Sequence, residues 1–209
     1  MSWQSVVEVW PNQALLYVPA LPGFLVNAES PDEAVADAQE RIDAFIQWLR
    51  DGELAEELRS GDDLIVAEEL TAEGDLGPIF QLDAAPPDVD ATEFALAVGR
   101  AALSDLLFVF DDIPEGERSA AERTLRHVAE MDRWYATRMA PAQGKPFAVL
   151  EDELVQSASL FEETVDAVAA SDQPTIWTLD REFWSVRKAL RRRTGHLREH
   201  LLDLLTLVR

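Results

Sequence analysis

Four long segments with helical periodicity fill the second half of the chain, and this feature constrains the fold most strongly. The segments cover roughly residues 91–112, 118–139, 148–170 and 180–208. Breaks that each contain a proline separate them at 114–116, 141–146 and 171–174. Long helices joined by short loops pack beside their sequence neighbours in opposite directions. The sequence therefore predicts an all-α, up-down four-helix bundle.

The first 85 residues follow a different pattern, in which short β-rich runs alternate with turn signals. The runs cover 6–10, 15–19, 24–28 and 63–70. We therefore expect an α+β domain of three strands, a helix and a fourth strand. The segment QLDAAPPDVDAT at 81–92 is rich in proline and aspartate and marks the boundary. The expected domains are 1–85 and 86–209.

The helix between the third and fourth runs begins at Ser-Pro-Asp-Glu, residues 30–33. Ser30 can cap the helix, proline suits the first helical position, and glutamate follows three residues after the cap. Apolar residues then recur at helical spacing over 35–49. The pattern allows the helix to end at Gly52 or to continue to Gly61.

The composition excludes several kinds of site and partner. The chain has 209 residues and no cysteine, so disulfides and thiolate metal sites are excluded. Its formal net charge of -22 disfavours binding to nucleic acid and to anionic membranes. A solvated acidic surface explains the charge best, and a high-salt environment is the alternative. No apolar run approaches the roughly 18–20 residues that cross a bilayer, and no signal peptide is apparent. We expect a cytoplasmic protein.

All three histidines lie at the edge of the predicted bundle core. His196 and His200 are one turn apart on the last helical segment, beside its apolar stripe. His127 flanks the stripe of the second segment. If the three imidazoles converge, they form a facial metal site with open coordination positions. The alternative is that each is an ordinary polar residue at a core edge.

The sequence HLREH at 196–200 also matches the inverted zinc-protease pattern, in which Glu199 acts as the general base. That chemistry needs a third ligand well downstream, whereas nine residues follow His200. Glu199 also projects to the polar face of the helix. We therefore disfavour a protease.

Two sequence stretches in the second half together resemble the DinB/YfiT-like family of metal-binding four-helix bundles. They are LRHVAEMDRWYATRM at 125–139 and REFWSVRKALRRRTGHLREHLLDLL at 181–205. The resemblance covers residues 90–209 and implies that His127, His196 and His200 bind one divalent metal. Zinc, nickel and iron are not distinguished. Some members resemble S-transferases or isomerases that use a low-molecular-weight thiol.

The stretch YVPALPGFLVNAESPDEAVADAQERIDAFIQWLR at 17–50 resembles the HicB-like antitoxin domain. The shared features are a strand, a Leu-Pro-Gly turn, a second strand and a Ser-Pro-Asp-Glu-Ala helix start. An antitoxin would bind a small basic toxin. Such antitoxins carry a separate DNA-binding segment, and no basic helix or ribbon follows here.

Several further residues are candidates for the site. Glu130 and Asp203 each follow a predicted ligand by three residues and are candidates to hold an imidazole by a hydrogen bond. Trp134 is a candidate pocket residue on the flank of His127. The basic run 187–193 either pairs with acids on neighbouring helices or binds an anionic substrate, and Arg193 is the best placed for substrate.

These observations lead to two functional hypotheses. In the first, the bundle is a metal-dependent thiol S-transferase or hydrolase that acts on a small molecule; its catalytic residues are unknown. In the second, the protein is a non-enzymatic binding or regulatory protein whose HicB-like domain mediates partner contact or dimerisation. The family resemblance suggests a homodimer.

Overall fold

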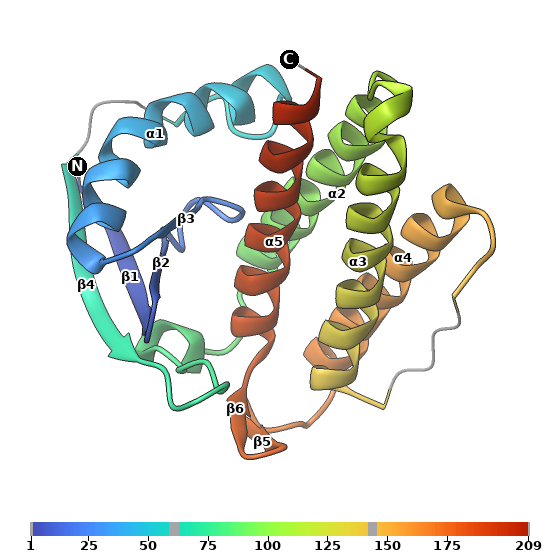
Figure 1. Ribbon diagram of the computed structural model, residues 1–209. Coiled ribbons are helices and arrows are strands. Elements are labelled where there is room, and N and C mark those ends of the chain that lie inside the picture. The colour runs from blue at the N-terminus through green and yellow to red at the C-terminus, as the bar shows by residue number, and fades with distance from the viewer. Residues whose placement is uncertain (1, 59–62, 142–145, 209) are drawn as a thin grey trace.

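The computed structural model describes residues 2–58, 63–141 and 146–208. A sheet and one helix precede four long helices (Figure 1). The elements in chain order are β1 (Ser2–Trp10), β2 (Gln13–Tyr17), β3 (Leu25–Ala28), α1 (Pro31–Asp51), β4 (Asp63–Thr71), the 3-10 helix η1 (Gln81–Ala84), α2 (Val89–Asp111), α3 (Glu115–Met139), α4 (Leu150–Ala169), β5 (Trp177–Leu179), β6 (Glu182–Trp184) and α5 (Val186–Leu207).

The N-terminal part is a four-stranded sheet with α1 packed on one face (Figure 1). The strand order is β3-β2-β1-β4, and β1 pairs parallel with β4 and antiparallel with β2. The predicted succession of three strands, a helix and a strand is therefore correct at the level of element type. The Ser30 hydroxyl accepts a hydrogen bond from the Glu33 backbone, as its capping role requires. The helix ends at Asp51 with Gly52 as its C-cap, and residues 52–58 are not helical, so the alternative in which the helix continues toward Gly61 is wrong.

The four helices of the C-terminal part also lie close to their predicted ranges. α2 packs along α5, α3 packs along α4, and α3 also contacts α5. The structure therefore confirms the predicted order of an α+β part followed by a helical part. Leu106, Leu125, Leu154 and Leu197, one from each helix, are all fully buried in one apolar cluster. Burying a leucine of this kind contributes roughly 1.5–3 kcal/mol to folding.

The predicted start of the last helix is wrong. The predicted segment begins at residue 180, whereas α5 begins at Val186. The preceding residues form the hairpin of β5 and β6, because Trp177, Phe183 and Trp184 favour extended backbone. The Ser185 side chain then accepts a hydrogen bond from the Lys188 backbone and caps α5.

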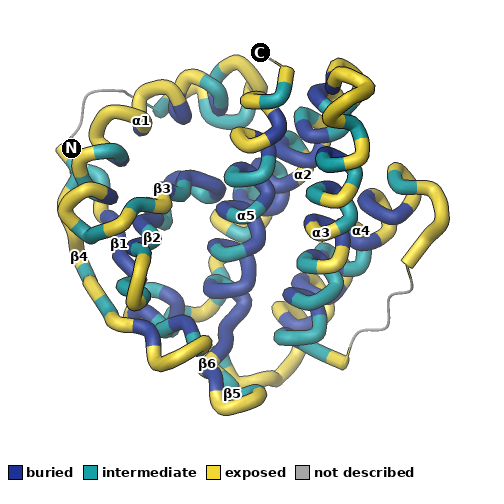
Figure 2. Tube along the Cα trace, in the orientation of Figure 1, coloured by how far each residue is buried: buried dark blue, intermediate teal, exposed yellow. Residues whose placement is uncertain are grey.

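The two parts meet along α5, which is buried over much of its length (Figure 2). Gly195 allows this close approach, because a Cβ atom there would lie 3.3 Å from Leu25 and Tyr17 on the sheet. Val98 of α2 also belongs to the apolar cluster beneath α1. The apolar cores of the two parts are therefore in contact.

No helix among the described residues is both long enough and apolar enough to cross a bilayer.

Candidate metal centre

The three histidines converge in the structure, although α3 and α5 carry them from positions far apart in the sequence. The Nε2 atom of His196 lies 3.2 Å from Nε2 of His127 and 3.0 Å from Nε2 of His200. One ligand nitrogen from each ring lies within 4.8 Å of the other two. His127 is exposed, and His196 and His200 are half-buried, so the cluster opens to solvent.

Two of the three separations fit a shared metal ion, and the third pair, His127 and His200, lies within 4.8 Å and would have to close on the ion. With metal–nitrogen bonds of about 2.1 Å, nitrogens 3.0–3.2 Å apart subtend roughly 90–100° at the metal. Such angles lie between those of an octahedral face and those of a tetrahedron. Three ligands on one side leave the other coordination positions open for water or substrate.

Hydrogen bonding among the three rings alone cannot satisfy the cluster. The Nδ1 atom of His200 lies 3.1 Å from the Asp203 carboxylate, which favours the tautomer with a lone pair on Nε2. Nε2 of His196 carries at most one proton, yet it faces two other ring nitrogens. At least one nitrogen–nitrogen contact therefore lacks a well-directed hydrogen bond. A cation would accept all three lone pairs at once.

The surroundings favour the neutral, metal-binding form of two of the imidazoles, those of His196 and His127. Burial, followed by the neighbouring His200, His127 and Arg193, lowers the pKa of His196 to about 3. Burial and His200 also lower the pKa of His127, and Glu130 opposes this change. Near neutral pH, metal binding would therefore release few protons from the His196 and His127 rings.

Of the two acids predicted to hold an imidazole, Asp203 contacts a histidine and Glu130 does not. Asp203 makes the contact with His200 described above, which orients the ring. Glu130 is exposed, and no hydrogen bond joins it to His127 within the described part of the chain. It acts on His127 only through its charge.

Arg193 does not reach an open pocket, in contrast to its predicted role as a substrate-binding group. Its side chain is buried between α3 and α5, where Nε and Nη2 each donate to Asp132 at 2.9 Å. The guanidinium also lies over the Phe161 ring at 4.6 Å. An arginine held in this way stabilises the helix pair that carries the histidines. The sequence reasoning missed Asp132, although an aspartate five residues after His127 was a usable signal.

Trp134 belongs to an aromatic cluster next to the histidines. Its ring packs edge-on against Tyr135 and Trp184, with centroids 5.1 and 5.4 Å away. Tyr135 in turn lies 6.4 Å from His196, centroid to centroid. Burial raises the pKa of Tyr135 to about 12, so its hydroxyl stays protonated near neutral pH. The cluster is an aromatic wall beside the three histidines.

The Glu199 side chain is directed toward the sheet. Its carboxylate accepts a hydrogen bond of 3.2 Å from the Asn27 amide on β3. A general base of the inverted zinc-protease type has to face the metal, and Glu199 does not.

Three more residues of the basic run pair with buried acids, and two of them, Arg191 and Arg192, thereby link the two parts of the protein. Arg191 donates to Glu8 and Asp83, and Arg192 donates to Glu8, at nitrogen–oxygen distances of 2.8–2.9 Å. Lys188 donates to Glu182 at 2.8 Å. The predicted pairing with acids is therefore what the structure shows, but Glu8 comes from the sheet and not from a helix. These charges face inward, so the run does not form a basic surface.

Comparison with protein-family models, with curated proteins and with solved structures finds no match for this chain. The two family resemblances therefore stand on the sequence motifs alone.

Proposed function

We propose that the protein binds one divalent metal ion through His127, His196 and His200. The observation that supports this proposal is the convergence of three ring nitrogens, with two separations of 3.0 and 3.2 Å, at a solvent-accessible position. Three imidazoles and no thiolate favour zinc, nickel, iron or another divalent transition metal over calcium or magnesium.

We further propose that the helical part is an up-down bundle of the DinB/YfiT-like family and that the metal serves catalysis. When bound, such a metal would lower the pKa of a coordinated water or thiol, so that a nucleophile is available near neutral pH. The thiol would have to be exogenous, because the chain has no cysteine. A thiol S-transferase or a hydrolase acting on a small molecule fits this chemistry.

The residues around the site have distinct tasks in this proposal. Asp203 orients His200, and the Arg193–Asp132 pair fixes the spacing between the two ligand-bearing helices. Trp134 and Tyr135 exclude water from one side of the site. An apolar wall beside a metal strengthens electrostatic interactions at the reacting atoms.

The decisive experiment is a zinc and nickel titration of untagged, chelator-treated protein by calorimetry, with elemental analysis of the protein as purified. We expect one equivalent of metal per chain in the wild type and none in the His196→Ala/His200→Ala variant. Cobalt(II) should give visible d–d bands without thiolate charge transfer, since no sulfur ligand from cysteine exists.

Asn27→Ala is a matched control, because it removes a polar side chain beside α5 without touching a histidine. It should bind metal like the wild type. If a folded wild type takes up neither zinc nor nickel, the metal proposal is wrong. The non-enzymatic alternative, with the N-terminal domain binding a partner, would then be the better account.

A further inference from the structure

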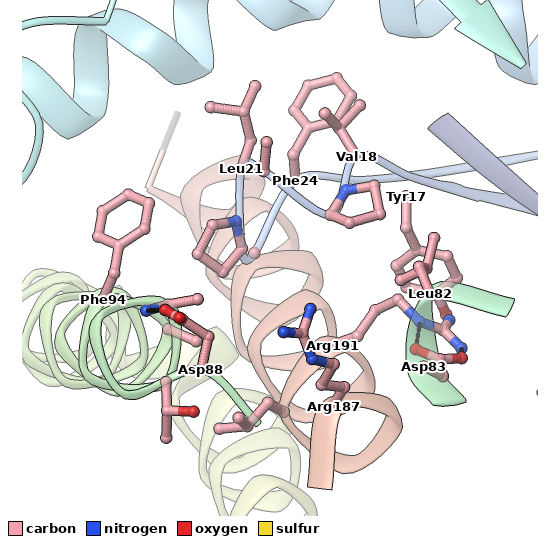
Figure 3. A pocket seen from close by; sticks show the side chains of 18 residues that line it. Tyr17, Val18, Leu21, Phe24, Leu82, Asp83, Asp88, Phe94, Arg187 and Arg191 are labelled. Carbon is pink, nitrogen blue, oxygen red and sulfur yellow. Dashed lines mark hydrogen bonds and ion pairs between the residues drawn. The ribbon is translucent and has the colours of Figure 1, made fainter. Parts of the chain in front are cut away.

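A second candidate site lies between the two parts of the protein, away from the histidines. One wall is the turn over residues 17–24, which joins β2 to β3. The other walls come from the start of α2, from η1 and from the first turns of α5. Figure 3 shows these side chains around a common space. None of the three histidines lines this cavity.

The cavity is small, and its walls are mostly apolar. Its volume is about 130 Å³, slightly less than the roughly 150 Å³ of an apolar cavity that binds benzene. Val18, Leu82, Phe94 and Leu190 contribute apolar side chains. Ala20 and Ala91 at its margin are exposed, so a ligand can enter from solvent.

The polar side chains of the cavity differ in how far their hydrogen bonds are satisfied. Arg191 and Asp83 pair with each other, and the Asp88 carboxylate accepts from the Ala91 backbone to cap α2. Arg187 donates only through Nε, to the backbone oxygen of Pro86 at 3.0 Å. Within the described residues, no hydrogen bond or ion pair involves its terminal nitrogens.

The cavity thus holds a partly exposed cation whose two terminal nitrogens have no protein partner among the described residues and are free to donate to a ligand. Most other arginines in the described chain pair with a carboxylate, as expected when acids are in such excess. Figure 3 shows the Arg187 guanidinium directed into the space between the turn and α2. A planar guanidinium with free Nη atoms recognises a carboxylate through two parallel hydrogen bonds.

We propose that this cavity binds a small monocarboxylate with a compact apolar body about the size of a benzene ring. The body fills the space between Val18, Phe94 and Leu190, and the carboxylate accepts hydrogen bonds from the Arg187 Nη atoms. The site does not depend on the metal centre, because its lining and the three histidines occupy different faces of α5.

The test uses three probes of one shape and different charge: benzoate, benzyl alcohol and benzylamine. Each is titrated into the isotope-labelled full chain with EDTA present, and backbone amide shifts are followed by NMR. Benzoate should move the amides of residues 18–24 and 91–95 and bind at least about tenfold more tightly than the other two. Arg187→Gln should remove that preference.

Further variants test whether the probes occupy the cavity itself. Ala91→Phe places a ring at the cavity margin and should weaken binding of all three probes. Arg123→Gln, which alters an exposed arginine on α3, should change nothing. The His196→Ala/His200→Ala variant should bind benzoate as the wild type does, even if the metal proposal fails.

Three results would overturn the inference. The first is an absence of shifts at 18–24 and 91–95 in millimolar benzoate. The second is tighter binding of benzylamine, which would assign the site to Asp88. The third is benzoate binding that survives in Arg187→Gln but disappears in the double histidine variant, which would mean ligation at the metal centre.

Discussion

Arg193 and Asp132 form a two-pronged ion pair in the interior, with both nitrogen–oxygen distances at 2.9 Å. Asp132 lies five residues after His127 on α3, and Arg193 lies three residues before His196 on α5. The pair therefore joins the two ligand-bearing helices about one turn from the histidines. Both side chains are almost completely buried.

Asp132→Ala should lower the free energy of unfolding by about 3–5 kcal/mol, because it leaves the Arg193 charge buried without its partner. Urea unfolding followed by tryptophan fluorescence measures this change. Asp37→Asn, which breaks the exposed Arg41–Asp37 pair, is the control and should cost less than about 1 kcal/mol. Equal effects of the two substitutions would show that the buried pair has no special role.

Asp203→Asn should weaken zinc binding by about 10–100-fold, because the side chain that orients His200 loses its charge. Glu130→Gln should change zinc affinity much less, since no hydrogen bond joins Glu130 to His127 in the described chain and it contributes only through its charge. Competition with a chromophoric chelator at constant pH measures both affinities. A larger loss in Glu130→Gln would reverse our assignment of the two acids.

The buried Glu8 carboxylate makes stability depend on acidic pH. Burial by itself would raise its pKa, but the Arg191 and Arg192 guanidinium groups outweigh this and lower it to about 2. A carboxyl whose pKa is lowered by folding stabilises the native state above its unfolded pKa of about 4.5. That stabilisation is lost as the pH falls from about 4.5 through 2.

Glu8→Gln should therefore be less stable than the wild type at pH 7 by roughly 3 kcal/mol, and the difference should shrink below pH 4. Urea unfolding at pH 7, 4 and 3 gives the comparison. A difference that stays constant over this range would show that the Glu8 charge does not contribute to stability.

Gly77→Ala should destabilise the same ion-pair network by a steric route. A Cβ atom at this position would lie only 2.0 Å from Nη2 of Arg192, so the guanidinium would have to move away from Glu8. We expect a loss of about 1–3 kcal/mol in the free energy of unfolding. Gly116→Ala is the control, because nothing lies within 4 Å of its added Cβ and the residue is helical. It should leave stability unchanged or raise it slightly.

The sequence by itself determined the type and order of most elements. Local signals were sufficient there: Ser30 and the following proline begin α1, Gly52 ends it, and prolines separate the long helices. Helical spacing placed His196 and His200 on one flank, because residues four apart lie on the same side of a helix. The hairpin before α5 was missed, since its strands have only three residues each.

Only the tertiary structure decided which charges meet. Helical periodicity shows that a residue lies near a core edge, but it does not show which residue of another element faces it. Glu8 on β1 and Arg191 on α5 are 183 positions apart, and Arg193 and Asp132 are 61 apart. The sequence therefore predicted that the arginines pair with acids or bind an anionic substrate, but it did not identify the acids. Folding turned these arginines inward, because burying these charges is favourable only where carboxylates neutralise them.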